Sequence, residues 1–588
     1  MKRIIEFLKG LGERLLASIQ RFWVSLLLPV VAVVLLIMYN HDLISASFEP
    51  YWERFTMLAA LGFPLSLVLT YVGERFKFKP FLTQMANLIL TGLLLIAYYH
   101  FWLQNTEYVS VIRYIGISLG LYLAFLFIPP LLRKDETDYS LHIVHLFLRF
   151  VSSFLYAQVI YLGTQIILSS FELLFVVQPI PGLGFDFWLS ATWIFAPIYF
   201  LGGLSGSFDN HLSKSIEAKY PKGFEVLLSY ILVPLVSVYT LMLYAFFGKI
   251  LITRTWPSGV IAHLVLWYSV FSAVLLLFIT PLDTKNRVAR GFLKFFPKLN
   301  LPLLIMMFVA IGKRISAHGF TENRYFVLIL GTWVAGWMFY YSIMKKRRNI
   351  FLPISLCLII VLSMIGPWSS FSVSKNSQNQ RLHTLLQENR LLENGKIVAN
   401  PEVDEEVQAE IGSIVEYFHD KHSLSDLKIL PQGFVIDDFQ DLFGFKYRTF
   451  SLYGVRDRDY FSIMLHANDR LFSLDNHDFL AEIISWDSPE LSINNGSLMV
   501  SFKSDDSILV INLDGEKVYE RSVKDLSSTF LSEEDWPFDN KKVYEITDQG
   551  RNVTVRYIFK SINGWRTKGS GKIEPNSFNF YLLISNAD

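Results

Sequence analysis

The chain has 588 residues, of which 52% are hydrophobic and 15% aromatic, and only 18% are charged. This composition is too apolar for one water-soluble domain and indicates that lipid surrounds much of the chain. The formal net charge of +1 gives no basic excess and argues against nucleic acid as a partner. The single cysteine, Cys357, excludes an intrachain disulfide, a cysteine-based zinc site and an iron–sulfur cluster. We therefore expect neither a metal nor another cofactor.

The first 21 residues have an amphipathic pattern. Apolar side chains recur at three- and four-residue spacing, with lysine and arginine between them: Ile4, Phe7, Leu8, Leu11, Leu15 and Ile19. This spacing predicts an interfacial amphipathic helix over 1–21. A cleaved signal peptide is the less favoured alternative, because the following apolar run is long and Ser45 and Ser47 are weak cleavage cues.

Apolar windows of about 20 residues fill the segment 22–370 and predict a bundle of about eleven transmembrane helices. The windows lie at 22–40, 55–73, 81–103, 109–129, 143–169, 185–204, 224–248, 260–281, 300–318, 324–343 and 350–368. The chain is therefore predicted to be a multi-pass membrane protein with the lipid bilayer as its main surroundings.

Lysine and arginine gather in alternate predicted loops, at 74–79, 133–134, 214–222, 285–298 and 345–348. The loops between them hold few cations, so the positive-inside rule places the N-terminus in the cytoplasm. An odd number of spans then places the residues after 370 outside, in the periplasm of a bacterium with an inner membrane. The ninth window is continuously apolar only over 301–312, and a re-entrant segment there would instead leave the C-terminal part in the cytoplasm.

After residue 370 the sequence becomes polar and predicts a helical connector over 371–444. Leucine spacing in 380–396 predicts a helix that ends at Gly395. A second helix is predicted with Asn400 as its cap and Pro401 in its first turn. Its expected buried stripe is Val403, Val407, Ile411, Ile414 and Phe418.

The segment 445–588 is predicted to be a β-rich α+β soluble domain. Four turn pairs separate short β segments and predict consecutive hairpins: Asn495-Gly496, Asp514-Gly515, Gln549-Gly550 and Asn563-Gly564. Within 553–560, one strand face should be buried, made of Val553, Val555, Tyr557 and Phe559. The predicted fold class is thus a polytopic α-helical membrane protein with a C-terminal β-rich α+β soluble domain.

The fifth span contains the best candidate polar site inside the membrane. His145, Arg149, Ser152 and Tyr156 fall within about 60° of one another on a helix that turns 100° per residue. They could form a polar cavity or a site for an anionic lipid headgroup. The favoured interpretation is structural, because arginines near a span end and polar contacts between helices are common in large bundles.

The remaining candidates are weaker. Gly116 and Gly120 form a GxxxG pair, which is typical of close helix packing. Three carboxylates on the first outer loop resemble those that transferases of lipid-linked sugars use, namely Asp42, Glu49 and Glu53. His419 and His422 form an HxxH pair without a third ligand and are expected to be exposed at a helix end. No nucleophile elbow, Walker loop or Rossmann fingerprint is present, so the sequence assigns no catalytic residue.

The stretch 220–282 resembles a bacterial polytopic family catalogued as domain of unknown function 4153. The residues that carry the resemblance are Pro234, Leu235, Val236, Tyr239, Leu243, Tyr244, Ala245, Trp256, Pro257, Ser258 and Gly259. The resemblance implies the membrane architecture and transfers no catalytic residue.

Three functions remain open at this level. The first is a non-enzymatic envelope protein of the bacterial inner membrane, which binds a protein or lipid partner through its periplasmic domain for sensing or assembly. The second is a transporter or flippase for a lipid-linked substrate that uses Arg149. The third is a membrane-embedded glycosyl or acyl transferase that uses the outer-loop carboxylates. Whether the chain is an enzyme is left undecided, with the absence of catalysis favoured.

Overall fold

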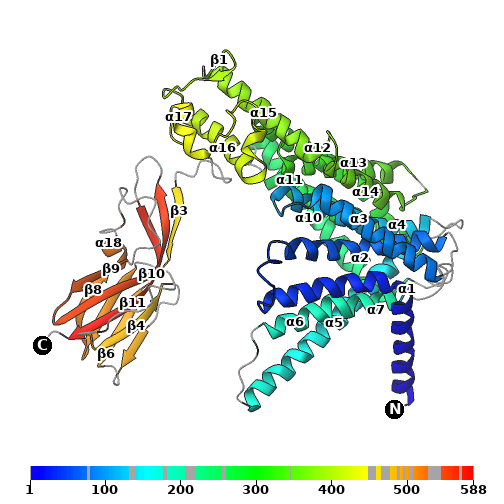
Figure 1. The fold of residues 1–588 in the computed structure, drawn as a ribbon, viewed down its shortest axis with the longest axis horizontal. Helices are drawn as coiled ribbons and strands as arrows, with labels where there is room; N and C mark the ends of the chain where they lie inside the picture. Colours follow the sequence, from blue (N-terminus) through cyan, green and yellow to red (C-terminus); the bar gives the residue numbers. More distant parts are fainter. Residues whose placement is uncertain are drawn as a thin grey trace. The chain divides into compact units, whose positions relative to one another are not determined.

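The computed structural model divides the chain into two compact units, Met1–Arg448 and Thr449–Asp588 (Figure 1). In the first unit it describes residues 2–75, 80–131, 139–175, 180, 182–204, 220–253, 260–344 and 346–447. In the second it describes residues 458–464, 474, 477–485, 490–493, 497–503, 507–527, 531, 544–567 and 573–586. The predicted cationic loop 133–134 and most of 74–79 and 214–222 lie outside the described residues.

The first unit is helical, as predicted. Its elements in order are α1 (Lys2–Asn40), α2 (Trp52–Arg75), α3 (Pro80–Trp102), α4 (Tyr108–Leu131), α5 (Tyr139–Phe175), α6 (Leu183–Ser190), π-helix η1 (Ala191–Phe195), α7 (Ala196–Gly202), α9 (Lys222–Val226), π-helix η2 (Leu227–Leu232), α10 (Val233–Thr253), α11 (Val260–Ile279), α12 (Arg287–His318), α13 (Glu322–Ile343) and α14 (Phe351–Met364). Among the described residues, nine helical stretches are long and apolar enough to cross a membrane. The predicted sixth and eleventh spans are not among them, and α14, which corresponds to the eleventh, has only 14 residues.

Helix α1 joins the predicted amphipathic segment and the first predicted span. Its backbone leaves helical geometry at Phe22, where φ is −119° and ψ is 25°. Phe22 is wholly buried, and the guanidinium of Arg21 donates two hydrogen bonds to the Glu74 carboxylate, at 2.6 and 2.7 Å. The kink therefore lies at the residue where the sequence changes from amphipathic to uniformly apolar.

Two of the predicted spans contain a wider π-helical turn directly before a proline. The segment η1 precedes Pro197, and η2 precedes Pro234. A proline lacks the amide hydrogen and its ring clashes with the carbonyl four residues earlier, and a wider preceding turn relieves that clash. Both spans continue as helices beyond the proline for this reason.

The prediction that 285–298 is a loop is wrong from residue 287 onward. Helix α12 begins at Arg287, and its cap Asn286 accepts hydrogen bonds from the amides of Val288 and Ala289, at 2.9 and 3.2 Å. Ala289, Phe292, Leu293 and Phe296 in its first turns are buried, so the cations between them do not end the helix. With 32 residues, α12 is about 48 Å long. It is a continuous helix and one of the stretches that are long and apolar enough to cross a membrane.

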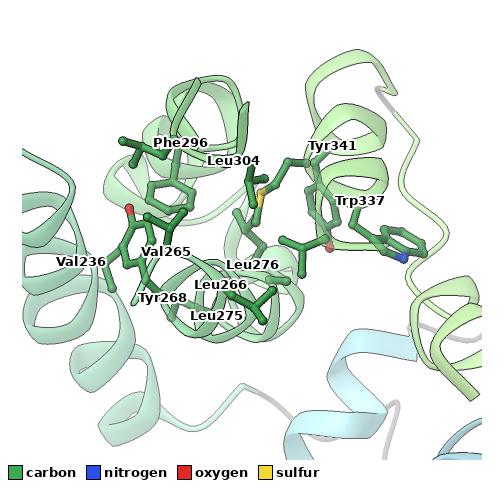
Figure 2. Packing of buried hydrophobic residues seen from close by; sticks show 14 of the residues in the cluster. Val236, Val265, Leu266, Tyr268, Leu275, Leu276, Phe296, Leu304, Trp337 and Tyr341 are labelled. Atoms are coloured by element: carbon green, nitrogen blue, oxygen red, sulfur yellow. The ribbon is translucent and has the colours of Figure 1, made fainter. Parts of the chain in front are cut away.

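The largest apolar core of the first unit lies where α10, α11, α12 and α13 pack together. Figure 2 shows Tyr268 of α11 beside Phe296 of α12, and Tyr341 and Trp337 of α13 on the other side of the cluster. The aromatic rings of Tyr268 and Phe296 meet edge to face, with their centroids 6.2 Å apart. The segment that carries the family resemblance therefore contributes directly to this core through α10 and α11.

The connector follows α14 and packs as part of the first unit. It consists of α15 (Ser370–Glu388), a small hairpin of β1 (Leu392–Glu393) and β2 (Lys396–Ile397), α16 (Glu405–Lys421), and α17 (Phe439–Phe443). The predicted stop at Gly395 is wrong, since α15 ends at Glu388 and Asn394-Gly395 form the hairpin turn, both with positive φ. The predicted cap Asn400 is also wrong, because α16 begins at Glu405 and Asp404 occupies the position before it. The predicted stripe of α16 is confirmed, with Ile411, Ile414 and Phe418 at most 1% exposed.

The second unit is a two-sheet β structure. One sheet has the order β3-β10-β11-β4, with β9 also paired to β10, and the other has the order β5-β6-β7-β8. The strands are β3 (Arg458–Met464), β4 (Phe479–Ile484), β5 (Glu490–Ile493), β6 (Leu498–Lys503), β7 (Ile508–Leu513), β8 (Glu516–Ser522), β9 (Glu545–Gln549), β10 (Val553–Thr567) and β11 (Ile573–Asn586), with a short helix α18 (Val523–Ser527) after β8. Side chains of both sheets share one apolar core.

Two of the predicted turn pairs are confirmed and one is wrong. Asp514-Gly515 joins β7 to β8, and Gln549-Gly550 lies at the β9–β10 turn. Asn563-Gly564 lies inside β10, at a register shift against β11, because a Cβ on Gly564 would come within 2.5 Å of the Glu574 carbonyl oxygen. The strands β5 and β6 pair as predicted, but Asn495-Gly496 lie outside the described residues. The predicted buried face of 553–560 is confirmed.

Candidate functional site

The four polar residues predicted in the fifth span, His145, Arg149, Ser152 and Tyr156, lie on α5. Three of them make contacts described here. The guanidinium of Arg149 donates a hydrogen bond to the carbonyl oxygen of Gly203, just after α7. The hydroxyl of Ser152 bonds to the carbonyl of its own helix at Leu148, and the Tyr156 ring meets the Tyr199 ring edge to face at 5.2 Å. His145 is partly buried on the same helix. These contacts join α5 to α7.

The predicted glycine pair lies where α4 meets α14. A Cβ on Gly116 would come within 2.6 Å of the Met364 side chain, and one on Gly120 within 3.2 Å of Val361. The Cys357 thiol donates a hydrogen bond to the Gly120 carbonyl, with sulfur and oxygen 3.3 Å apart. The two glycines thus bring α14 close to the backbone of α4.

The three outer-loop carboxylates, on Asp42, Glu49 and Glu53, are exposed. The buried acid in this region is instead Asp186 of α6, which bonds to His41 at 2.5 Å and to Asn40 at 2.9 Å. Within the part of the chain that the structure describes, no three His, Cys, Asp or Glu residues lie close enough to hold a metal ion.

A buried polar cluster links the connector to the start of α13. Glu322 is the first residue of α13, Tyr417 belongs to α16, and His422 follows the end of α16. The Glu322 Oε1 atom accepts a hydrogen bond from the Tyr417 hydroxyl at 2.7 Å and lies 2.9 Å from the His422 Nε2 atom. The side chains of His422 and Glu322 are only 1% and 0% exposed. Burial and the nearby Glu322 carboxylate raise the pKa of Tyr417, so its hydroxyl remains a donor.

The prediction that both connector histidines are exposed is wrong for His422, although His419 is exposed. The partner of His422 lies 100 residues earlier in the chain, so local spacing gave no indication of the pair. A sequence signal for Glu322 did exist. It is a glutamate at the start of an apolar span, and such a residue needs a partner at the edge of lipid.

A cavity of about 340 Å³ opens beside His422. Its wall comes from the end of α3, the start of α4, the end of α14 and the first turns of α15. The lining residues are Trp102, Val109, Arg113, Met364, Ile365, Gly366, Ser369, Phe371, Ser372, Lys375 and His422. This set combines apolar and aromatic side chains with two cations, and it contains no carboxylate.

The cavity and the connector share one end of the bundle, which we call the connector end. At that end the Gln378 side chain of α15 donates hydrogen bonds to the carbonyls of His318 and Phe320, at 3.0 and 2.7 Å. The start of α12 lies at the opposite end, where Arg347 and Asp283 form an ion pair at 3.4 Å. Helix α12 therefore runs from one end of the bundle to the other.

These features define a multi-pass membrane protein with a connector docked on one end of its helices and a separate β-rich unit. The chain belongs to the family described as domain of unknown function (DUF4153), which matches residues 27–405 and confirms the resemblance seen in the sequence. The Trp256–Gly259 part of that resemblance lies outside the described residues.

Comparison with curated proteins finds an uncharacterized protein of Pasteurella multocida (strain Pm70), PM1469, which is 23% identical over 221 residues. The match spans 37% of this chain and 37% of that protein. No solved structure matches the chain.

Proposed function

We propose that the protein is a non-enzymatic component of the bacterial cell envelope, located in the inner membrane, whose connector end and second unit face the periplasm. The observation that carries this proposal is the connector end itself. It joins a cation-lined cavity to a connector that is held on the spans by the buried Glu322–His422 pair. A ligand in the cavity would contact α3, α4, α14 and the connector together, which is the arrangement that a binding or sensing role requires.

The distribution of cations supports the orientation. The end of the bundle opposite the connector carries the cations that start α12 and follow α13, including Arg287, Arg290 and Arg348. The positive-inside rule places that end in the cytoplasm and the connector end outside. Since the second unit follows the connector in sequence, the same rule supports a periplasmic second unit.

The other two functions receive less support from the geometry. A flippase that binds its substrate through Arg149 would need that guanidinium to face a ligand, and here it bonds to the Gly203 carbonyl. A transferase that uses Asp42, Glu49 and Glu53 would need them to converge, whereas all three are exposed on a loop and on the first turn of α2.

The second unit offers a plausible surface for a protein partner on its edge strand β3. Tyr460 and Met464 of β3 are 56% and 62% exposed, and the Tyr460 ring meets the Trp565 ring edge to face at 5.0 Å. Exposed aromatic side chains on an edge strand are typical of surfaces that bind proteins.

A photoreactive benzoylphenylalanine at Tyr460 tests this proposal in growing cells. The matched control carries the same group at Glu516, an exposed residue beside the β7–β8 turn. We expect cross-links to periplasmic or envelope proteins from position 460 and not from position 516. Cross-links to cytoplasmic proteins alone, or equal cross-linking from both positions, would contradict the proposal.

A further inference from the structure

We propose that the cavity at the connector end binds the phosphate group of a membrane lipid headgroup. This inference rests on the proposed function, because it names the ligand of the same site. Arg113, in the second turn of α4, is the residue that would bind the phosphate.

Arg113 is a half-buried cation without a carboxylate partner in the described chain. Its Nε atom donates a hydrogen bond to the Met364 carbonyl at 3.3 Å, and its guanidinium carbon lies 5.3 Å from the centre of the Phe371 ring. These contacts fix the side chain in the wall of the cavity. No hydrogen bond to another described residue occupies its two terminal nitrogens, and those nitrogens have the geometry that binds two oxygens of one phosphate.

Two further groups add positive potential to the same cavity. Lys375 lines it and is only partly neutralised, since its ammonium group forms a 3.1 Å ion pair with Asp426 in which both side chains are about one-third exposed. Helix α15 also begins at the cavity, with Ser369 as its cap and 19 residues behind it. The Ser369 hydroxyl accepts a hydrogen bond from the Ser372 amide, and the helix dipole at this end favours an anion.

His422 also lines the cavity. Its Nε2 atom is fixed by Glu322 at 2.9 Å and by Tyr417 at 3.0 Å, so the imidazole ring has a defined orientation. The Glu322 Oε1 atom therefore accepts hydrogen bonds from two connector side chains, and Glu322 is not among the residues that line the cavity. The charged groups that line the cavity itself are cationic.

The apolar part of the wall indicates a lipid as the source of the phosphate. Trp102 ends α3 and is 37% exposed, while Met364 and Ile365 end α14. Tryptophan at the end of a span is typical of the membrane–water interface, where lipid phosphates lie. A volume of about 340 Å³ accommodates a small headgroup but not the acyl chains, which would remain in the bilayer.

Native mass spectrometry of the full-length chain in detergent tests the proposal, with dioleoyl phosphatidic acid as the probe and dioleoyl phosphatidylcholine as the zwitterionic comparison. Arg113→Gln should weaken phosphatidic acid binding at least tenfold, about the effect of one charge-assisted contact. Lys375→Gln, at the more exposed edge of the cavity, should weaken it several-fold and provides a second variant if Arg113→Gln does not fold. Arg54→Gln is the matched control, since Arg54 lies at the same end and bonds to the Gln104 carbonyl.

Competition with inorganic phosphate distinguishes a site for the free phosphate ion from a site for the phosphate of a lipid headgroup. Displacement of phosphatidic acid by millimolar phosphate, lost in Arg113→Gln, would support a phosphate site that also accepts the free anion. Resistance to phosphate, with the same variant dependence, would support a lipid headgroup. Equal binding by wild type, Arg113→Gln and Lys375→Gln would overturn the proposal. The assay does not depend on membrane sidedness or on β3, so its failure is separate from a failure of the proposed function.

Discussion

At the scale of single residues, the buried Glu322–His422 pair couples two parts of the chain that the sequence separates. Neither side chain has appreciable contact with solvent, and Glu322 belongs to a span while His422 belongs to the connector. Removing His422 alone leaves the Glu322 carboxyl buried with only the Tyr417 hydroxyl as a partner, whereas removing both side chains leaves no buried carboxyl. The asymmetry between these two changes provides a test.

His422→Leu should destabilise the docked connector by about 3 kcal/mol, or more than a hundredfold in its local opening. The double variant Glu322→Leu/His422→Leu should recover a large part of that loss, because no carboxyl then remains buried without its imidazole partner. Hydrogen exchange of the α16 amides in the full chain measures both. Equal exchange in the single and double variants would show that the pair does not hold the connector.

Asp548 in β9 gives a prediction for the second unit. Burial alone would raise its pKa, but hydrogen bonds from Tyr519 and Arg521, at 2.8 and 3.0 Å, outweigh burial and keep the pKa below its usual range. A lowered folded-state pKa adds stability that is present above the unfolded pKa and is lost as the pH falls through the folded value. Asp548→Asn should therefore cost about 1 kcal/mol near neutral pH, and this difference should shrink below about pH 4.

Exchange of the β9 and β10 amides in the full chain, corrected for intrinsic rates, measures the effect of Asp548→Asn. The neighbouring change Glu545→Gln is the control, since the Glu545 side chain is 47% exposed in its pair with Arg556. It should change exchange little. If Asp548→Asn destabilised the second unit equally at pH 7 and pH 3, the lowered pKa of Asp548 would not be the cause of the effect.

At the scale of elements, sequence periodicity predicted most helices but not every boundary. The long apolar windows became helices because each must satisfy its own backbone in lipid. The start of α12 was missed because its cations lie between apolar residues that are buried, such as Phe292 and Phe296. Gly395 and Gly564 were assigned to the wrong elements, since a glycine serves a helix stop, a hairpin turn or a bulge equally well. The candidate site was missed because its parts meet only in the folded bundle.

The contact between α4 and α14 gives a prediction at this scale. A Cβ on Gly120 would lie 3.9 Å from the Cys357 sulfur. In a disulfide the Cβ of one cysteine lies about 3 Å from the sulfur of the other, so a side-chain rotation that closes about 1 Å should let Gly120→Cys form a disulfide with Cys357 under mild oxidation.

Peptide mass spectrometry would detect the bond between positions 120 and 357. Gly92→Cys on α3 is the control, because a Cβ there meets nothing within 4 Å. It should keep both thiols free. Retention of free thiols in Gly120→Cys as well would contradict the observed packing of α4 against α14.

At the scale of the whole molecule, the proposed function requires the connector end to face the periplasm. The structure relates the span ends to one another, since α12 runs from the Asp283–Arg347 pair to the connector end. This relation distinguishes the two ends of the bundle, and the distribution of lysine and arginine is the basis of our proposal that the connector end faces the periplasm.

Thiol labelling tests this assignment most directly. In a Cys357→Ser background, single cysteines replace Glu516 in the second unit and Thr284 just before α12, both exposed positions. Intact spheroplasts are treated with a membrane-impermeant maleimide and compared with detergent-opened ones. We predict that position 516 reacts in intact spheroplasts and that position 284 reacts only after opening. Reaction of position 284 alone in intact spheroplasts would place the connector end and the second unit in the cytoplasm and contradict the account.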